Sequence, residues 1–192
     1  CLLCLVEPFV AIWLGQDFVL TKAILILAVA IYYFKGINSG IDIAKNAAGL
    51  YYPDRFIPMA EAIANMVISI VLAKRYGIAG VLFGTLVSFL ALSFWAKPYF
   101  VCRDVFEVSF ARYAVREGRE IVVSVLVAAG TWYAVSLVSL ENVLLSFGVK
   151  ALLALALSNG LLLLVYFKTS EFQYLRGLLE SAANRIGKRK KA

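Results

Sequence analysis

Residues 78–96 read IAGVLFGTLVSFLALSFWA, nineteen consecutive positions without a charged side chain. A helix needs roughly 20 mainly apolar residues to cross a bilayer, and a helix that is apolar on every side has no face for water. Residues 121–140 form a second uncharged stretch, and residues 143–167 contain one charged side chain, that of Lys150. Several such stretches in one chain of 192 residues predict an integral membrane protein.

The composition leads to the same prediction. Hydrophobic residues make up 62% of the chain and charged residues 16%, whereas soluble domains contain about 45–50% apolar and about 25% charged residues. Disordered chains are poor in large aliphatic residues, so disorder is excluded as well. The expected fold class is therefore all-α, a polytopic bundle of transmembrane helices.

The hydrophobic pattern predicts five complete spans after one partial span, within a transmembrane part at residues 1–167. The first complete span can continue as a helix towards Ala48, and the charged segment 97–120 suits a short helix in the membrane interface. Because Cys1 lies inside an apolar run, we expect the chain to be a fragment whose N-terminal part is missing. A basic amphipathic tail is expected at residues 168–192. The partial span is 1–14, and the complete spans are 18–36, 56–73, 78–96, 121–140 and 143–167.

The positive charge indicates an orientation. The chain has a formal net charge of +7, from 19 Lys and Arg against 12 Asp and Glu. With the C-terminus in the cytoplasm, about fifteen of these basic residues fall on the inner side, and Lys22, Lys74, Arg75 and Lys150 on the outer side. Such a bias is typical of cytoplasmic loops. We therefore expect a cytoplasmic C-terminus and no nucleic-acid partner.

No set of catalytic residues emerges from the sequence. There is no His, and the three Cys residues lack the spacing of metal ligands. We find no phosphate-binding glycine loop and no carboxylate pair at a defined spacing. We therefore expect no enzyme activity, no cofactor and no metal, and a transporter is the simplest interpretation.

Polar residues inside apolar spans are costly and usually face a cavity or a partner. One group lies at helical spacing in the first complete span and its continuation, and a second group lies in and just before the span at 56–73. Together they predict a vestibule open to the cytoplasm. Two structural alternatives stay open, because Lys35 can extend to the headgroups and Glu61 can pair with a nearby cation to hold helices together. The candidate substrate-binding residues are Lys35, Asn38, Asp42, Lys45, Arg55, Glu61 and Asn65.

Residues 47–106 carry a more specific pattern. Asp54-Arg55 is followed by Pro58, then by Glu61-Ala62 with Asn65 and Ser69, and then by Gly77-Ile78-Ala79-Gly80 with Gly84-Thr85. This pattern resembles the C-terminal half of the bacterial polysaccharide flippases. These are the Wzx-like, oligosaccharide-exporting branch of the superfamily that includes the multidrug and toxin extruders. The resemblance covers almost the whole chain and is strongest at 47–106.

The resemblance implies a fold and a function. The fold would be the C-terminal lobe of a transporter with roughly twelve spans in two lobes, like that of the multidrug and toxin extruders. The function would be transfer of an undecaprenyl-diphosphate-linked oligosaccharide across the bacterial cytoplasmic membrane, by alternating access, for surface polysaccharide biosynthesis. Lys35 would then contact the diphosphate, and Asp42, Lys45, Arg55, Glu61 and Asn65 would be gate or sugar-contact residues.

The expected partners are the lipid-linked oligosaccharide, membrane lipids, the missing N-terminal lobe, a polysaccharide polymerase and glycosyltransferases. Two other functions stay open. One is a multidrug or toxin cation antiporter of the same superfamily, which would favour acidic cavity residues. The other is a non-catalytic membrane scaffold of a polysaccharide assembly complex.

Overall fold

The structure is a computed structural model that describes residues 1–52, 55–138, 143–167 and the single positions 169, 172, 174 and 177. Within these residues every regular element is a helix. The expectation of an all-α protein is therefore confirmed. The tail expected at residues 168–192 lies, apart from those four positions, outside the described residues.

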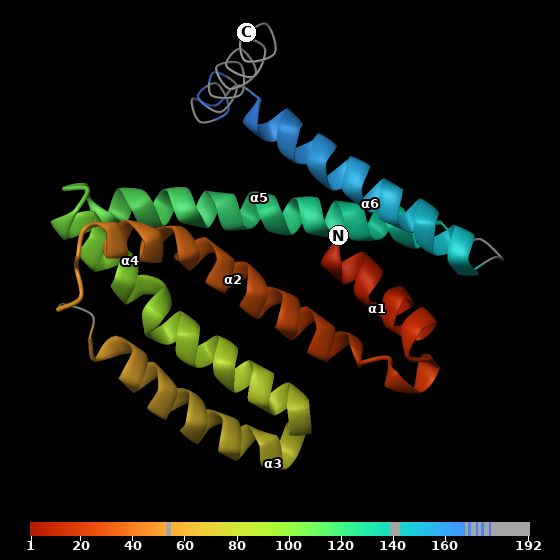
Figure 1. The fold of residues 1–192 in the computed structure, drawn as a ribbon, viewed down its shortest axis with the longest axis horizontal. Helices are drawn as coiled ribbons and strands as arrows, with labels where there is room; N and C mark the ends of the chain where they lie inside the picture. The colour runs from red at the N-terminus through yellow and green to blue at the C-terminus, as the bar shows by residue number, and fades with distance from the viewer. Residues whose placement is uncertain are drawn as a thin grey trace, which may run out of the picture. The chain divides into compact units, whose positions relative to one another are not determined.

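In the described part of the chain, six α-helices and one short 3₁₀ helix follow one another (Figure 1). Four stretches of helix are long and apolar enough to cross a membrane, namely Lys22–Ala47, Ile57–Asp104, Phe110–Ser136 and Leu145–Tyr166. They indicate a membrane protein. The elements are α1 (Leu2–Trp13), η1 (Gln16–Phe18), α2 (Lys22–Ala47), α3 (Ile57–Ala91), α4 (Ser93–Asp104), α5 (Phe110–Ser136) and α6 (Val143–Tyr166).

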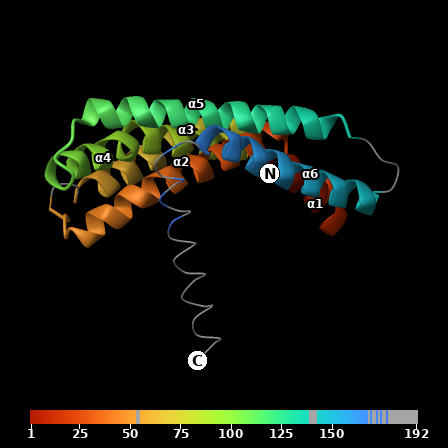
Figure 2. The same ribbon diagram turned by 90° about the horizontal axis from the view of Figure 1, so that it is seen from above.

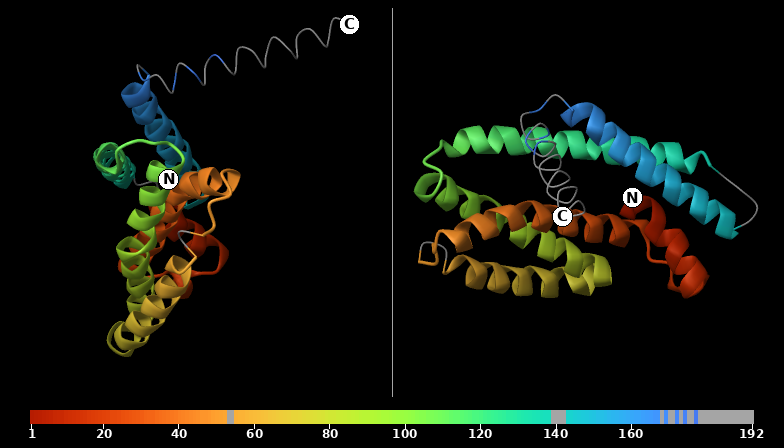
Figure 3. Two further views of the ribbon diagram at one scale, coloured as in Figure 1. Left: turned by 90° about the vertical axis from the view of Figure 1, so that its left-hand side faces the viewer. Right: turned by 45° about the horizontal axis from the view of Figure 1, so that its top comes forward.

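Helix α3 is a hairpin of two arms that meet at Gly77 (Figure 1). Gly77 has φ 56° and ψ −134°, a conformation that a residue with a Cβ rarely adopts. The arms, 57–76 and 78–91, then run back side by side, as both views of Figure 3 also show. They approach so closely that a Cβ added at Gly80 would lie 2.4 Å from the carbonyl oxygen of Leu72.

The chain divides into two compact units, and the larger one spans Leu2–Ser124. In this unit α2, α3 and α4 pack against one another (Figure 2). Helix α4 supplies Phe94, Val101 and Cys102 to the buried core, and α2 and α3 supply Leu25, Ile41 and Phe89. The Phe94 ring meets Phe34 of α2 edge to face, with ring centroids 5.4 Å apart. All three helices therefore contribute to the core of this unit.

The smaller unit comprises Val125–Ala192 together with Cys1. In its described part, small and polar side chains are buried on α6, among them Ser146 and Ala154. The Ser158 hydroxyl donates to the carbonyl oxygen of Ala154 at 2.6 Å, and the Cys1 sulfur lies 3.2 Å from the same hydroxyl. This unit contains none of the candidate site residues.

The helix boundaries differ from the sequence-based expectation around the charged segment 97–120. Helix α4 continues to Asp104 and α5 already begins at Phe110, so this segment forms the ends of two long helices. Arg and Glu are good helix formers and tolerate a helix that extends beyond its apolar stretch. The break falls at 105–109, where Glu107 has φ 51°. The helix expected from residue 18 begins instead at Lys22, and it continues to Ala47, as the expected extension towards Ala48 allows.

Candidate functional site

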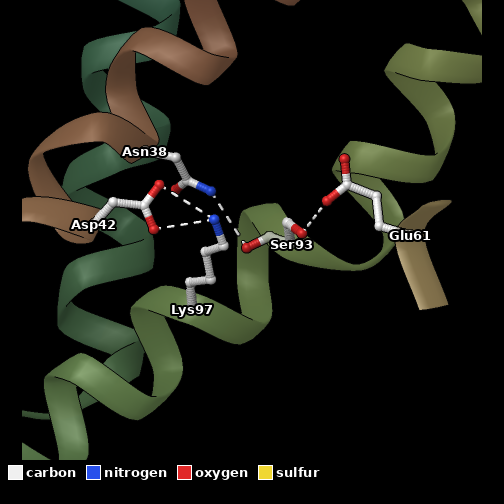
Figure 4. A network of polar contacts seen from close by, with 5 residues as sticks. All are labelled: Asn38, Asp42, Glu61, Ser93 and Lys97. Atoms are coloured by element: carbon white, nitrogen blue, oxygen red, sulfur yellow. Dashed lines mark hydrogen bonds and ion pairs between the residues drawn. The ribbon is translucent and has the colours of Figure 1, made fainter. Parts of the chain in front are cut away.

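An ion pair joins α2 to α4. The Lys97 ammonium lies 3.0 Å from Oδ1 and 3.2 Å from Oδ2 of Asp42 (Figure 4). The side chains of Lys97 and Asp42 are 16% and 36% exposed, so the pair is only partly removed from solvent. Charges held this way between apolar helices are uncommon and usually carry a function.

A second contact between the same helices lies one turn away. Asn38 of α2 is 2% exposed, and its Nδ2 donates to the carbonyl oxygen of Ser93 at 3.3 Å. Since Asn38 and Asp42 are four residues apart, as are Ser93 and Lys97, the two contacts form successive rungs. The pairing of 38 with 93 and of 42 with 97 means that α2 and α4 run in the same direction here.

The chain path around Ser93 explains why a helix carbonyl accepts this additional bond. Leu92 separates α3 from α4 with φ −111° and ψ −71°, so the helical path is distorted just before Ser93. Pro98 has no N–H group and cannot donate to the carbonyl of Phe94 four residues earlier. Neighbouring helices commonly satisfy the backbone groups that a proline frees inside a membrane helix. The Asn38 amide donates to the carbonyl of Ser93, one residue before the carbonyl that Pro98 frees.

Ser93 also connects α4 to the first arm of α3. Its hydroxyl makes a hydrogen bond with Oε2 of the Glu61 carboxylate (Figure 4). The sequence left Lys35, Lys45 and Arg55 open as partners for Glu61, whereas the contact found in the described part of the chain is with this hydroxyl. Ser93, on α4, therefore contacts α2 through its backbone carbonyl and the first arm of α3 through its side chain. We call Asn38, Asp42, Glu61, Ser93 and Lys97 the polar network.

A further set of polar contacts holds the α3 hairpin together. Oδ1 of Asn65 accepts from the hydroxyl of Ser69 at 2.9 Å and from that of Thr85 at 3.2 Å. The same two hydroxyls lie 3.3 Å and 3.1 Å from the carbonyl oxygen of Val81. Each hydroxyl has one proton, so it donates to one of these acceptors at a time. Asn65 thus links the two arms rather than facing the polar network.

Two of the basic candidates, Lys35 and Arg55, lie against aromatic rings. Lys35 is exposed, and its ammonium is 6.0 Å from the centroid of the Phe89 ring. Arg55 is exposed and lies over the rings of its chain neighbours Tyr52 and Phe56, at 4.4 Å and 4.5 Å. Lys45 is half-buried near the end of α2. The structure therefore brings together Asn38, Asp42 and Glu61, whereas Lys35 and Arg55 lie over aromatic rings.

Sequence reasoning missed two members of the network, Ser93 and Lys97. The pattern placed Lys97 at the start of a cytoplasmic connection, because it is the first charge after a long apolar stretch. The signal that could have found both residues is their spacing of four on one helix face. The matching partners, Asn38 and Asp42, have the same spacing on α2.

The electrostatics of the polar network favour positive or donating groups. It contains two carboxylates and one ammonium, so its formal charge is negative. Oδ1 of Asn38 is buried and has no hydrogen-bond partner among the described residues. A buried acceptor that receives no hydrogen bond destabilises the fold. This position therefore favours a ligand that donates a hydrogen bond over an anion. Within the described residues, no group of three or more His, Cys, Asp or Glu side chains could hold a metal ion.

Comparisons with family models, curated protein sequences and solved structures give no match to this chain.

Proposed function

We propose that the chain is part of a transporter that moves lipid-linked oligosaccharides across the bacterial cytoplasmic membrane. The observation that carries this proposal is the polar network, which links α2, α3 and α4 inside otherwise apolar helices. Ionisable residues within membrane helices commonly line a substrate path or a gate. The resemblance of residues 47–106 to polysaccharide flippases supplies the class of substrate.

Lys35 and the polar network would have different roles in transport. A diphosphate needs a cation, and Lys35 is a cation that is exposed and not engaged in the polar network. The network itself is negative in formal charge, so it would not hold the diphosphate. Its contacts between α2 and α4 instead suit a gate that breaks and reforms as the protein alternates between inward-open and outward-open states.

The proposal includes an orientation and a place in the cell. Basic residues are concentrated in the segments that we assign to the inner side, which favours a cytoplasmic C-terminus. A cysteine introduced at Arg112 would then react with a thiol reagent only when the reagent reaches the cytoplasm. Reaction from the outside of intact cells would refute this orientation.

The test changes Lys35 in the gene that encodes the chain. With Lys35→Ala, surface polysaccharide export should be abolished while the protein level, measured by immunoblot, stays unchanged. Lys22→Ala is the matched control, because Lys22 is an exposed lysine at the other end of the same helix. Normal export with Lys35→Ala would refute the diphosphate role. Normal export after deletion of the gene would refute the proposed function.

A second function, cation antiport, is favoured by one observation. Both carboxylates among the candidate residues, Asp42 and Glu61, belong to the polar network, and acidic side chains suit a cationic substrate. Efflux of a cationic dye that is lost with Glu61→Gln and retained with Lys35→Ala would support the antiporter. Polysaccharide export that is lost with Lys35→Ala, without efflux of the dye by the natural chain, would support the flippase.

A further inference from the structure

The first turns of α5 present a basic face that the proposed function does not use. Arg112, Val115, Arg116 and Arg119 are all exposed, and Val115 is 76% exposed. Their spacing of three, four and seven residues places them on one side of the helix. Glu117, on the other side, is half-buried. The helix therefore carries three arginines around one exposed apolar side chain, which we call the arginine face.

The same helix becomes apolar immediately after this face. Residues 121–136 contain no charged side chain, and Val122 continues the face with 58% exposure. A helix rises about 1.5 Å per residue, so Arg119, Arg116 and Arg112 lie roughly 3, 8 and 14 Å beyond Ile121 along the axis. The headgroup layer on each side of a bilayer is about 5–8 Å thick. The Cα of Arg119 thus lies within the headgroup layer, that of Arg116 at its outer limit and that of Arg112 beyond it.

We propose that the arginine face binds the headgroups of anionic phospholipids. Guanidinium groups form bidentate hydrogen bonds with phosphate oxygens, and the exposed apolar surface of Val122, on the hydrocarbon side of Arg119, suits the adjoining acyl chain. A soluble anion would use the arginines but gain nothing from Val122. The charge pattern along the helix, basic and then apolar, matches the order of layers in one leaflet. The proposal does not depend on the transported substrate.

A contact between Arg119 and its chain neighbour competes with the lipid. Nη2 of Arg119 lies 2.8 Å from Oε1 of Glu120, and the Arg119 side chain is 67% exposed. A solvent-exposed pair of this kind is weak, so a phosphate can replace the carboxylate. We therefore expect Glu120→Gln to strengthen lipid binding by releasing the Arg119 guanidinium.

The experiment measures lipid retention on the purified full chain by native mass spectrometry. The probes are phosphatidylglycerol, which is anionic, and phosphatidylcholine, which is not. A basic residue near an anionic surface contributes roughly five-fold in affinity. Arg116→Ala/Arg119→Ala should therefore weaken phosphatidylglycerol binding about 25-fold and leave phosphatidylcholine binding unchanged. Arg112→Ala should have a smaller effect because of its greater distance from the hydrocarbon.

The matched control is Arg103→Ala. Arg103 is also exposed and also paired with its neighbour, Asp104, but it lies on α4, outside the arginine face, and its guanidinium lies over the rings of Tyr99 and Phe100. Its replacement should leave phosphatidylglycerol binding unchanged. Equal losses in this control and in the double variant would overturn the proposal, because they would show a general charge effect.

Two further results would also overturn it. One is unchanged phosphatidylglycerol retention in the double variant, and the other is displacement of the lipid by millimolar inorganic phosphate. If the alanine variant does not fold, Arg116→Lys/Arg119→Lys keeps the charge and removes the bidentate geometry. That variant should bind phosphatidylglycerol more weakly than the natural chain, and equal binding would refute the guanidinium–phosphate contact.

Discussion

The close approach of the two arms of α3 predicts that Gly80→Ala weakens the fold. A Cβ at this position would lie 2.4 Å from the carbonyl oxygen and 2.5 Å from the carbonyl carbon of Leu72. Both neighbours are backbone atoms, which cannot rotate away as the end of a side chain can. The arms would have to separate by about 1 Å to restore van der Waals contact.

The expected change in the free energy of unfolding depends on two opposing effects. Replacing Gly by Ala inside a helix favours the helix by up to about 1 kcal/mol, whereas overpacking costs about 1–3 kcal/mol and occasionally more. Since the clash here is with backbone atoms, we expect the upper part of the range for overpacking. The net loss of unfolding free energy should then be about 1–2 kcal/mol. Separation of the arms would also lengthen the hydrogen bond between Thr85 and Asn65, now 3.2 Å.

The assay is reversible unfolding of the full chain in mixed micelles, followed by circular dichroism as denaturing detergent is added. Gly130→Ala is the matched control, because Gly130 is an exposed helical glycine at which an added Cβ would meet no atom within 4 Å. The control should be neutral or more stable by up to about 1 kcal/mol. Equal stability of Gly80→Ala and Gly130→Ala would refute the close packing of the hairpin.

Three further predictions use the same assay. Gly77→Ala should lose about 1–3 kcal/mol, because φ 56° with ψ −134° strains any residue with a Cβ; unchanged stability would mean that the turn has another conformation. In a double-mutant cycle, the losses of unfolding free energy caused by Asp42→Asn and Lys97→Met should differ from additivity by about 1 kcal/mol, a small value because the pair is partly exposed. Additive losses would argue against the ion pair. Thr131→Val should be neutral or stabilising by about 1 kcal/mol, because its buried hydroxyl has no hydrogen-bond partner among the described residues; a clear loss would reveal a partner.

The apolar helices could be predicted from the sequence because membrane partitioning depends on local composition. Residues 143–167 were expected as a span, and α6 covers Val143–Tyr166. The turn at Gly77 falls in the gap between the spans expected at 56–73 and 78–96. Boundaries were less predictable at the charged segment 97–120, because charged residues such as Arg112 and Arg116 are good helix formers inside or outside an apolar stretch.

Only part of the candidate site could be predicted from the sequence. The spacing of Asn38 and Asp42 placed both on one helix face, and the structure brings both into the polar network with Glu61. The partners on α4 were not foreseen, because Lys97 lies 55 residues from Asp42 in the chain. No periodicity within one helix encodes which turn of another helix it will meet.

Local composition is enough to establish that the chain is helical and apolar enough for a membrane, since each of these properties is a sum over neighbouring residues. Which polar groups meet is a matter of packing between distant segments. Gly80 lets the arms of α3 approach, and α2 lies parallel to α4 where Asn38 meets Ser93 and Asp42 meets Lys97. The two contacts between α2 and α4 each join residues 55 positions apart, so they appear only once the helices are packed in three dimensions.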